Sequence, residues 1–128
     1  MDGVLVQRMA SGVECIVGVK RDPVFGPVVV FGLGGVLVEV LKDVAVRRAP
    51  VSPEEALEMI RSLRGYPIFG PFRGRGPLDQ GAVAEVISRV SILAMDPRLL
   101  ELDVNPLFVM EEGQGVVCAD ALMNVKGE

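Results

Sequence analysis

Oxygen-bearing side chains recur at every second position near the C-terminus. Glu101, Asp103 and Asn105 alternate with the apolar residues Leu102 and Val104. In a β-strand, residues two apart point to the same face, so this pattern predicts the polar side chains on one face and the apolar ones in the core. Carboxylate and amide oxygens suit Mg²⁺, which keeps substrate phosphates in its coordination shell. The segment is therefore either one wall of a metal site or the solvated outer face of an edge hairpin.

Another acidic residue comes back to the same place if this segment forms a hairpin. Residues 99–110 are followed by a glycine-rich turn at 112–115 and by a mostly apolar strand at 116–122 that contains Asp120. A tight turn pairs the two strands and would set Asp120 opposite Asn105. We therefore predict that Asn105 and Asp120 converge on one divalent-metal site, with Asp103 on the same face.

The elements that must position these residues follow from the pattern upstream. Short apolar runs in the first half predict strands at residues 4–7, 13–20, 28–31, 37–40 and 44–46. A helix is predicted to begin at the N-cap Ser52, with Pro53 in its first turn and Glu55 completing a capping box, and Gly65 is expected to end it. Another helix is predicted over residues 79–95, capped by Asp79.

Glycine and proline dominate residues 70–77, between the two predicted helices, which indicates a surface loop. We interpret its Arg73 and Arg75 as solvated charges, with contact to an anionic phosphate as the alternative. The order of strands, two helices and a hairpin indicates an α+β fold. We expect a mainly antiparallel sheet with two helices packed on one face and a C-terminal hairpin.

The composition argues against several classes of function. The net charge is −4, which disfavours a nucleic-acid partner. The longest apolar stretch, residues 28–41, contains glycines and Glu39 and is shorter than the roughly 20 residues that span a bilayer. Because 50% of the residues are hydrophobic, we expect a core-rich body with an uncovered interface and no membrane partner.

Cysteine and histidine usage gives further expectations. Cys15 and Cys118 lie in apolar runs, and we predict two buried thiols in a reducing cytoplasm. There is no histidine, so the chain supplies no imidazole base and no phosphorylatable histidine of its own.

The C-terminal pattern resembles a known metal-binding hairpin. The segment from Asp103 to Leu107, with Asp120 following, is similar to that of succinyl-CoA synthetase beta subunits and ADP-forming acetyl-CoA synthetases, which are nucleoside-diphosphate-forming acyl-CoA synthetases with an ATP-grasp domain. The resemblance implies Asn105 and Asp120 as Mg²⁺ ligands. It implies Asp103 as a catalytic residue, either a ligand or the group that orients a partner's histidine.

The resemblance extends over nearly the whole chain. Residues 4–19 look like the strand between the two ATP-grasp lobes, which implies that the backbone of Gln7, Arg8 and Met9 receives adenine and that Glu14 binds the ribose. Residues 22–27, 31–35 and 39–43 match the acyl-CoA synthetase subgroup. A loop bordering the phosphates is implied there, with Gly34 and Gly35 as contacts, and a plain turn is the alternative.

Taken together, the resemblance implies one partial ATP-grasp domain over residues 1–128, the interlobe strand plus the second lobe, with the first lobe absent. ATP or ADP and Mg²⁺ are the implied cofactors, and CoA would bind elsewhere. The implied partners are the first lobe and a CoA-binding subunit with a phosphohistidine, and a second copy of this chain is a further candidate partner. We expect no activity from the chain alone. A non-enzymatic interaction module and a fragment of a different ATP-grasp ligase are the alternatives.

Overall fold

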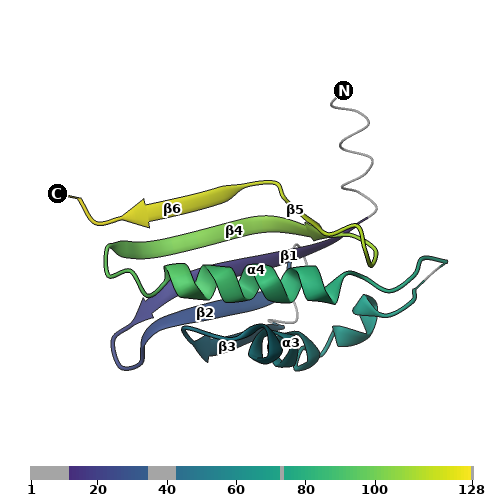
Figure 1. Ribbon diagram of the computed structural model, residues 1–128, viewed down its shortest axis with the longest axis horizontal. Coiled ribbons are helices and arrows are strands. Elements are labelled where there is room, and N and C mark those ends of the chain that lie inside the picture. Colours follow the sequence, from purple (N-terminus) through teal and green to yellow (C-terminus); the bar gives the residue numbers. More distant parts are fainter. Residues whose placement is uncertain (1–11, 35–42, 73, 128) are drawn as a thin grey trace.

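One antiparallel sheet and a layer of helices make up the described part of the chain (Figure 1). The computed structural model describes residues 12–34, 43–72 and 74–127. The predicted strands at 4–7 and 37–40 lie outside these residues. The elements in chain order are β1 (Val13–Asp22), β2 (Gly26–Leu33), β3 (Val44–Arg48), α3 (Pro53–Arg61), the 3-10 helix η1 (Tyr66–Phe69), α4 (Gln80–Leu93), β4 (Leu99–Val109), β5 (Val116–Cys118) and β6 (Ala121–Val125).

β1 lies in the middle of the sheet. The strand order is β3-β2-β1-β4-β5, and β6 also pairs with β4, beyond the end of β5. Every pairing is antiparallel. The predicted α+β architecture, with two helices on one face and a C-terminal hairpin, is confirmed. β4, which carries Asp103 and the candidate metal ligand Asn105, pairs directly with the central strand.

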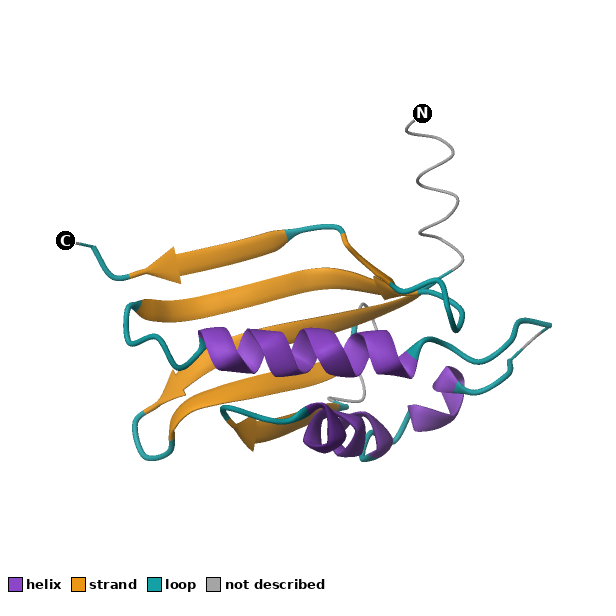
Figure 2. Cartoon of the chain, in the orientation of Figure 1, coloured by secondary structure: helices purple, strands orange, loops and turns teal. Residues whose placement is uncertain are grey.

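The two faces of the sheet have different environments because side chains alternate along each strand. In β1, Cys15, Val17 and Val19 are buried, whereas Glu14 and Lys20 are exposed. The buried set faces α3, which lies against β2 and β3, and α4, which lies against β1, β2 and β4 (Figure 2). We call the opposite face, which no described helix covers, the open face.

Local capping interactions fix the ends of both helices. The Ser52 hydroxyl accepts from the Glu55 N–H at 3.1 Å, and the Glu55 carboxylate accepts from the Ser52 N–H at 2.9 Å, which confirms the capping box. The prediction that Gly65 ends this helix is wrong: α3 ends at Arg61, with Ser62 as its C-cap. Gly65 instead allows a close approach, since a Cβ there would lie 2.4 Å from Leu33 Cδ1.

Asp79 joins the second helix to the C-terminal hairpin. Its Oδ1 accepts from the Ala82 N–H at 3.1 Å, which caps α4 as predicted. Its Oδ2 accepts from the N–H groups of Gly113 and Gly115 at 3.1 and 2.9 Å. Both glycines have positive φ angles, of 89° and 80°, so the turn that follows β4 has a fixed shape and a fixed attachment.

The C-terminal strand differs from the prediction in two ways. It is divided into β5 and β6 at positions 119–120 rather than running continuously. The prediction that Cys118 is buried is wrong, because β5 lies at the sheet edge and the thiol is exposed there. Cys15 is fully buried, as predicted. Burial raises the pKa of the Cys15 thiol to about 12, and the charge of neighbouring Glu14 acts in the same direction.

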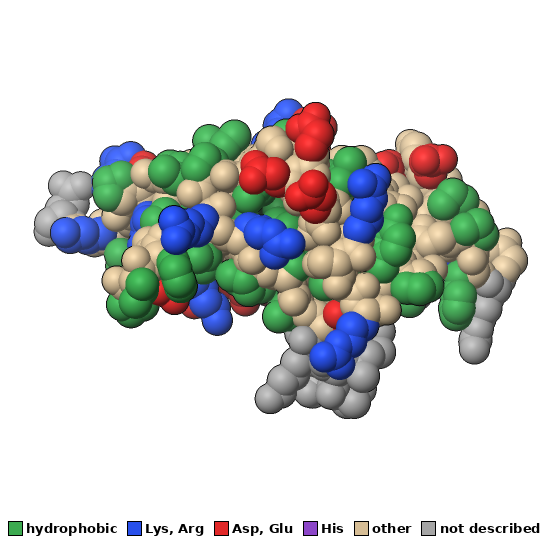
Figure 3. Space-filling model, turned by 90° about the horizontal axis from the view of Figure 1, so that it is seen from below, with side chains coloured by type: hydrophobic (Ala, Val, Ile, Leu, Met, Phe, Trp, Pro, Cys, Tyr) green, Lys and Arg blue, Asp and Glu red, His purple; other side chains and the backbone are tan. Residues whose placement is uncertain are grey.

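Among the described helices, none has the length and apolar character needed to cross a membrane. The molecule seen from the side of β3 and α3 shows acidic and basic side chains close to one another (Figure 3).

Candidate functional site

Asn105 and Asp120 lie directly beside each other in the sheet. Asp103 pairs with Leu122 and Val104 with Ala121, and the same register continues to the next position. There the Asn105 N–H donates to the Asp120 carbonyl oxygen at 3.2 Å. Residues directly opposite in an antiparallel pair share a face, with Cβ atoms roughly 5 Å apart. The structure therefore brings the backbones of Asn105 and Asp120 together, while a metal ion shared by their side chains stays a prediction.

The shared face is the open one. Asp103, Asn105 and Asp120 are exposed, whereas the intervening Val104 is buried. The Asp120 Oδ1 accepts from the Ala121 N–H at 2.9 Å, which fixes the direction of the carboxylate. Within the described residues, no hydrogen bond engages the side-chain oxygens of Asp103 or Asn105. Their lone pairs are therefore available to an external ligand.

A depression of about 310 Å³ lies beside the side chains of Asp103 and Asn105. Gly18 pairs with Asp103 across β1 and β4. A Cβ at this glycine would lie 3.3 Å from the Leu102 carbonyl oxygen and 3.8 Å from Asp103 Oδ1. Because glycine has no side chain, this part of the depression stays open. The depression combines an apolar side, a lysine and oxygen donors; it is lined by Ile16, Gly18, Val19, Lys20, Val30, Glu101, Leu102, Asp103 and Asn105.

The lining from β1 was not predicted. The sequence indicates only that Gly18 and Lys20 are strand residues on the same face as Glu14, by period-two alternation. What the sequence could not supply was the pairing of β1 with β4, which sets Gly18 beside Asp103. This pairing joins segments far apart in the chain, so no local sequence pattern predicts it.

The donor set fits a hard cation in part. Asn105, Asp120 and Asp103 offer amide and carboxylate oxygens, the ligands that Mg²⁺ prefers. Among the described residues, no group of three or more acidic or cysteine side chains is placed to hold a metal ion. The protein oxygens alone therefore leave the shell incomplete, and phosphate oxygens and water would have to fill the remaining positions.

Glu14 and Gly34 meet at the far end of β1 and β2. The Gly34 N–H donates to the Glu14 carbonyl oxygen at 2.8 Å. A Cβ at Gly34 would lie 3.2 Å from the carbonyl carbon of Glu14, so glycine permits the approach. Because this N–H is already used, the contact favours the turn interpretation for Gly34. The Glu14 side chain is exposed. The other predicted nucleotide contacts, Gln7, Arg8, Met9 and Gly35, lie outside the described residues.

Asp43 anchors the chain at the end of β2. Its carboxylate is buried, at 5% exposure, and accepts from the backbone N–H groups of Arg64 and Gly65 at 2.7 and 2.6 Å. Its carbonyl oxygen also accepts from the Leu33 N–H at 3.4 Å. The entrance to β3 is therefore tied to the segment after α3. The sequence does not indicate this role, since a lone aspartate gives no sign of being buried.

Arg75 has a structural role, so its interpretation as a solvated charge is wrong. Its guanidinium is half-buried and donates to the carbonyl oxygens of Gly70 and Gly76 at 3.0 Å each, and to that of Ile68. The loop has no regular secondary structure, so the Arg75 guanidinium supplies the hydrogen bonds that these backbone carbonyls need. Arg73 lies outside the described residues.

This architecture, a mainly antiparallel sheet with helices on one face and oxygen-bearing side chains on the other, is the one expected for the second lobe of an ATP-grasp domain. The chain belongs to the ATP-grasp domain family, whose model matches residues 1–125.

Its relatives are particular enzymes of that family. The chain is 52% identical over 119 residues to Acetate--CoA ligase [ADP-forming] I of Archaeoglobus fulgidus, covering 91% of this chain and 17% of that protein. It is 48% identical over 123 residues to Acetate--CoA ligase [ADP-forming] I subunit beta of Pyrococcus furiosus, covering 94% of this chain and 52% of that subunit. The chain thus spans about half the length of this beta subunit.

Solved structures of acetyl-coenzyme A synthetases have the same fold as this chain. The acetyl-coenzyme A synthetase 1 of Ca. Korarchaeum cryptofilum, in complex with coenzyme A and Mg-AMPPCP, matches with a TM-score of 0.83 at 38% identity. The match covers 90% of this chain and 54% of that one. The apo form of the same enzyme matches with a TM-score of 0.84. The predicted second lobe of an ATP-grasp domain is therefore confirmed as the fold.

Proposed function

We propose that this chain forms the nucleotide- and Mg²⁺-binding part of an ADP-forming acyl-CoA synthetase. The reaction would convert an acyl-CoA, ADP and phosphate into the free acid, CoA and ATP, with a phosphohistidine as carrier. The names of the relatives support this assignment, and a related structure contains both CoA and a magnesium nucleotide. The function would be carried out in the cytoplasm, where ADP and CoA are available.

The observation that carries the proposal is the backbone contact between Asn105 and Asp120. Asn105 and Asp103 also line the depression. Asn105 and Asp120 would hold the metal, which when bound neutralises phosphate charge during phosphoryl transfer. Asp103, on the same face, would add a ligand or orient the partner's histidine. Glu14 would accept from the ribose hydroxyls, and the backbone of residues 7–9 would receive adenine.

Other polypeptide must complete this site under the proposal. The chain covers only about half of the related beta subunit, and it contains no histidine. The first ATP-grasp lobe, the CoA site and the phosphohistidine would lie outside these residues. The isolated chain would therefore show no acyl-CoA-dependent ATP formation, and activity would require the complementary parts.

Paramagnetic broadening tests the metal site without depending on activity. Mn²⁺ replaces Mg²⁺ in oxygen-ligand sites, so Mn²⁺ with ADP added to the ¹⁵N-labelled chain should broaden amide signals at 103–105 and 119–121 first. Asp120→Asn keeps the shape of the side chain and removes its charge, so it should abolish the selective broadening. Glu58→Gln, in an exposed acidic residue of α3, is the matched control and should leave it unchanged.

The pattern of broadening distinguishes the proposed enzyme part from a non-enzymatic interaction module. Broadening confined to the two hairpin segments and lost in Asp120→Asn supports the proposed site. Broadening that follows the acidic residues of α3 instead, or that is the same in both variants, would contradict it. The chain would then be better described as an interaction module that has kept the fold.

A further inference from the structure

The helix layer stops before the sheet does. α3 lies against β2 and β3, and α4 against β1, β2 and β4, but β6 extends beyond them with no helix in front of it (Figure 1). β6 is exposed at every position. On its helix side, Met123 pairs with Leu102 and Val125 with Leu99, two core residues. Yet Met123 and Val125 are 56% and 54% exposed. One side of β6 therefore continues the core-facing side of the sheet, but no described helix packs on it.

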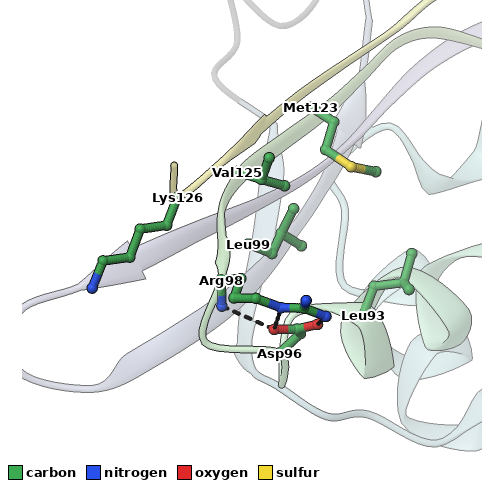
Figure 4. A pocket seen from close by; sticks show the side chains of 7 residues that line it. All are labelled: Leu93, Asp96, Arg98, Leu99, Met123, Val125 and Lys126. Carbon is green, nitrogen blue, oxygen red and sulfur yellow. Dashed lines mark hydrogen bonds and ion pairs between the residues drawn. The ribbon is translucent and has the colours of Figure 1, made fainter. Parts of the chain in front are cut away.

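A groove of about 410 Å³ runs between the end of α4 and this side of β6 (Figure 4). Leu93 of α4 forms one wall and is 51% exposed, while Leu99 forms the floor and is buried. Met123 and Val125 form the other wall. The remaining lining residues are Asp96, Arg98 and Lys126. We call these seven residues the β6 groove.

The charges of the β6 groove leave one cation without a partner among the described residues. Arg98 Nη2 lies 2.8 Å from Asp96 Oδ2. The hydrogen bonds from the Arg98 side chain lower the pKa of Asp96 to about 2, so both groups are charged at neutral pH and offset each other. Lys126 forms no ion pair within the described ranges. An occupant with apolar side chains and a carboxylate near Lys126 would fit.

Layer geometry indicates which element the β6 groove accommodates. Neighbouring strands lie about 4.8 Å apart, so β6 is two spacings, roughly 10 Å, beyond β1. Packed helices have their axes about 8–10 Å apart. A helix placed one helix spacing beyond α4, on the side away from α3, would therefore lie over β6. It would bury Leu93 on one flank and Met123 and Val125 beneath it.

We propose that the β6 groove seats an amphipathic α-helix contributed by the part of the ATP-grasp domain that lies outside this chain. That part is substantial, because the chain covers only 52% of the related beta subunit. The helix completes the helix layer, with an apolar stripe on the groove and an acidic residue near Lys126. The source of the helix rests on the proposed function, but the docking does not require a metal or a nucleotide.

Co-expression of two polypeptides tests the inference. The complete chain is produced with the tagged portion of the Pyrococcus furiosus subunit beta to which it does not align, and its recovery on the tag is measured. Leu93→Glu and Met123→Glu put a carboxylate into opposite walls of the groove, so recovery should fall by about tenfold or more. Ile92→Glu is the matched control: Ile92 is 58% exposed, adjacent to Leu93 and absent from the groove lining, so recovery should be unchanged.

Each outcome decides for or against the inference. Loss in both groove variants, with retention in Ile92→Glu and in Asp120→Asn, supports it and is independent of the metal site. No recovery of the wild-type chain, or equal recovery of all variants, overturns it. A self-associated chain that Leu93→Glu dissociates would make a second copy the occupant. Protection from hydrogen exchange along the outer edge of β6 would indicate an added strand instead of a helix.

Discussion

Replacing Asp79 separates two roles that this carboxylate combines. One oxygen caps α4 through the Ala82 N–H, and the other holds the turn after β4 through Gly113 and Gly115. Asp79→Ala removes both roles. Asp79→Ser keeps an N-capping hydroxyl, but its side chain is too short to reach the turn. The two variants therefore measure the cap and the attachment of the hairpin separately.

The magnitudes follow from the contacts. Loss of an N-cap costs about 1 kcal/mol. The two hydrogen bonds to the turn have a charged acceptor, but Asp79 is only half-buried, so together they contribute about 1–3 kcal/mol. We expect Asp79→Ser to lower the free energy of unfolding by about 1–3 kcal/mol, and Asp79→Ala by about 1 kcal/mol more.

Urea denaturation with linear extrapolation measures both values. Amide hydrogen exchange at Gly113 and Gly115 should accelerate equally in the two variants, because both lose the attachment of the turn. The reasoning is refuted if either variant is as stable as the wild type, or if exchange at these glycines is unchanged. Equal stability of the two variants would show that the cap contributes nothing.

Two further predictions concern thiols and packing. Ellman's reagent should label only Cys118 in the folded chain, since Cys15 is buried and its pKa is raised to about 12. After unfolding, the reagent should label both thiols. Rapid labelling of two thiols in the folded chain would contradict the burial of Cys15. Because the folded-state pKa of Cys15 is raised, its contribution to stability is complete below pH 9 and declines from there toward pH 12, and a Cys15→Ala variant should lack that decline. Gly32→Ala should destabilise the chain by about 1–3 kcal/mol in thermal or urea unfolding, because a Cβ there would lie 2.6 Å from Val44 Cγ1, whereas Gly127→Ala, with open space around it, should not; equal stability of the two would refute the packing argument.

The sequence predicts those local contacts that a few neighbouring residues determine. Ser52, Glu55 and Asp79 were predicted as caps and act as caps, since each satisfies N–H groups within one helical turn. The side-by-side placement of Asn105 and Asp120 was also predictable. A short hairpin with a fixed turn determines which positions face each other.

The remaining features depend on distant parts of the chain. Cys118 is exposed because the helices do not extend over the edge strand, and the sequence near it carries no sign of this. The low floor of the depression requires Gly18 to meet Asp103, which depends on the pairing of β1 with β4. The carbonyls that engage Arg75 belong to an irregular loop whose path no periodicity predicts.

The position of β1 has a consequence for how the chain is made. Arg21, at the end of β1, donates to the carbonyl oxygen of Leu99, 78 positions later, where β4 begins. At 5–20 residues per second, the ribosome takes roughly 4–16 s to cover that interval. Until then β1 has one free edge, and the apolar side chains of β1 and β2 have no complete core to enter. An unpaired strand edge beside apolar side chains is a template for pairing with another chain, so the interval between the synthesis of β1 and that of β4 is the one most exposed to aggregation.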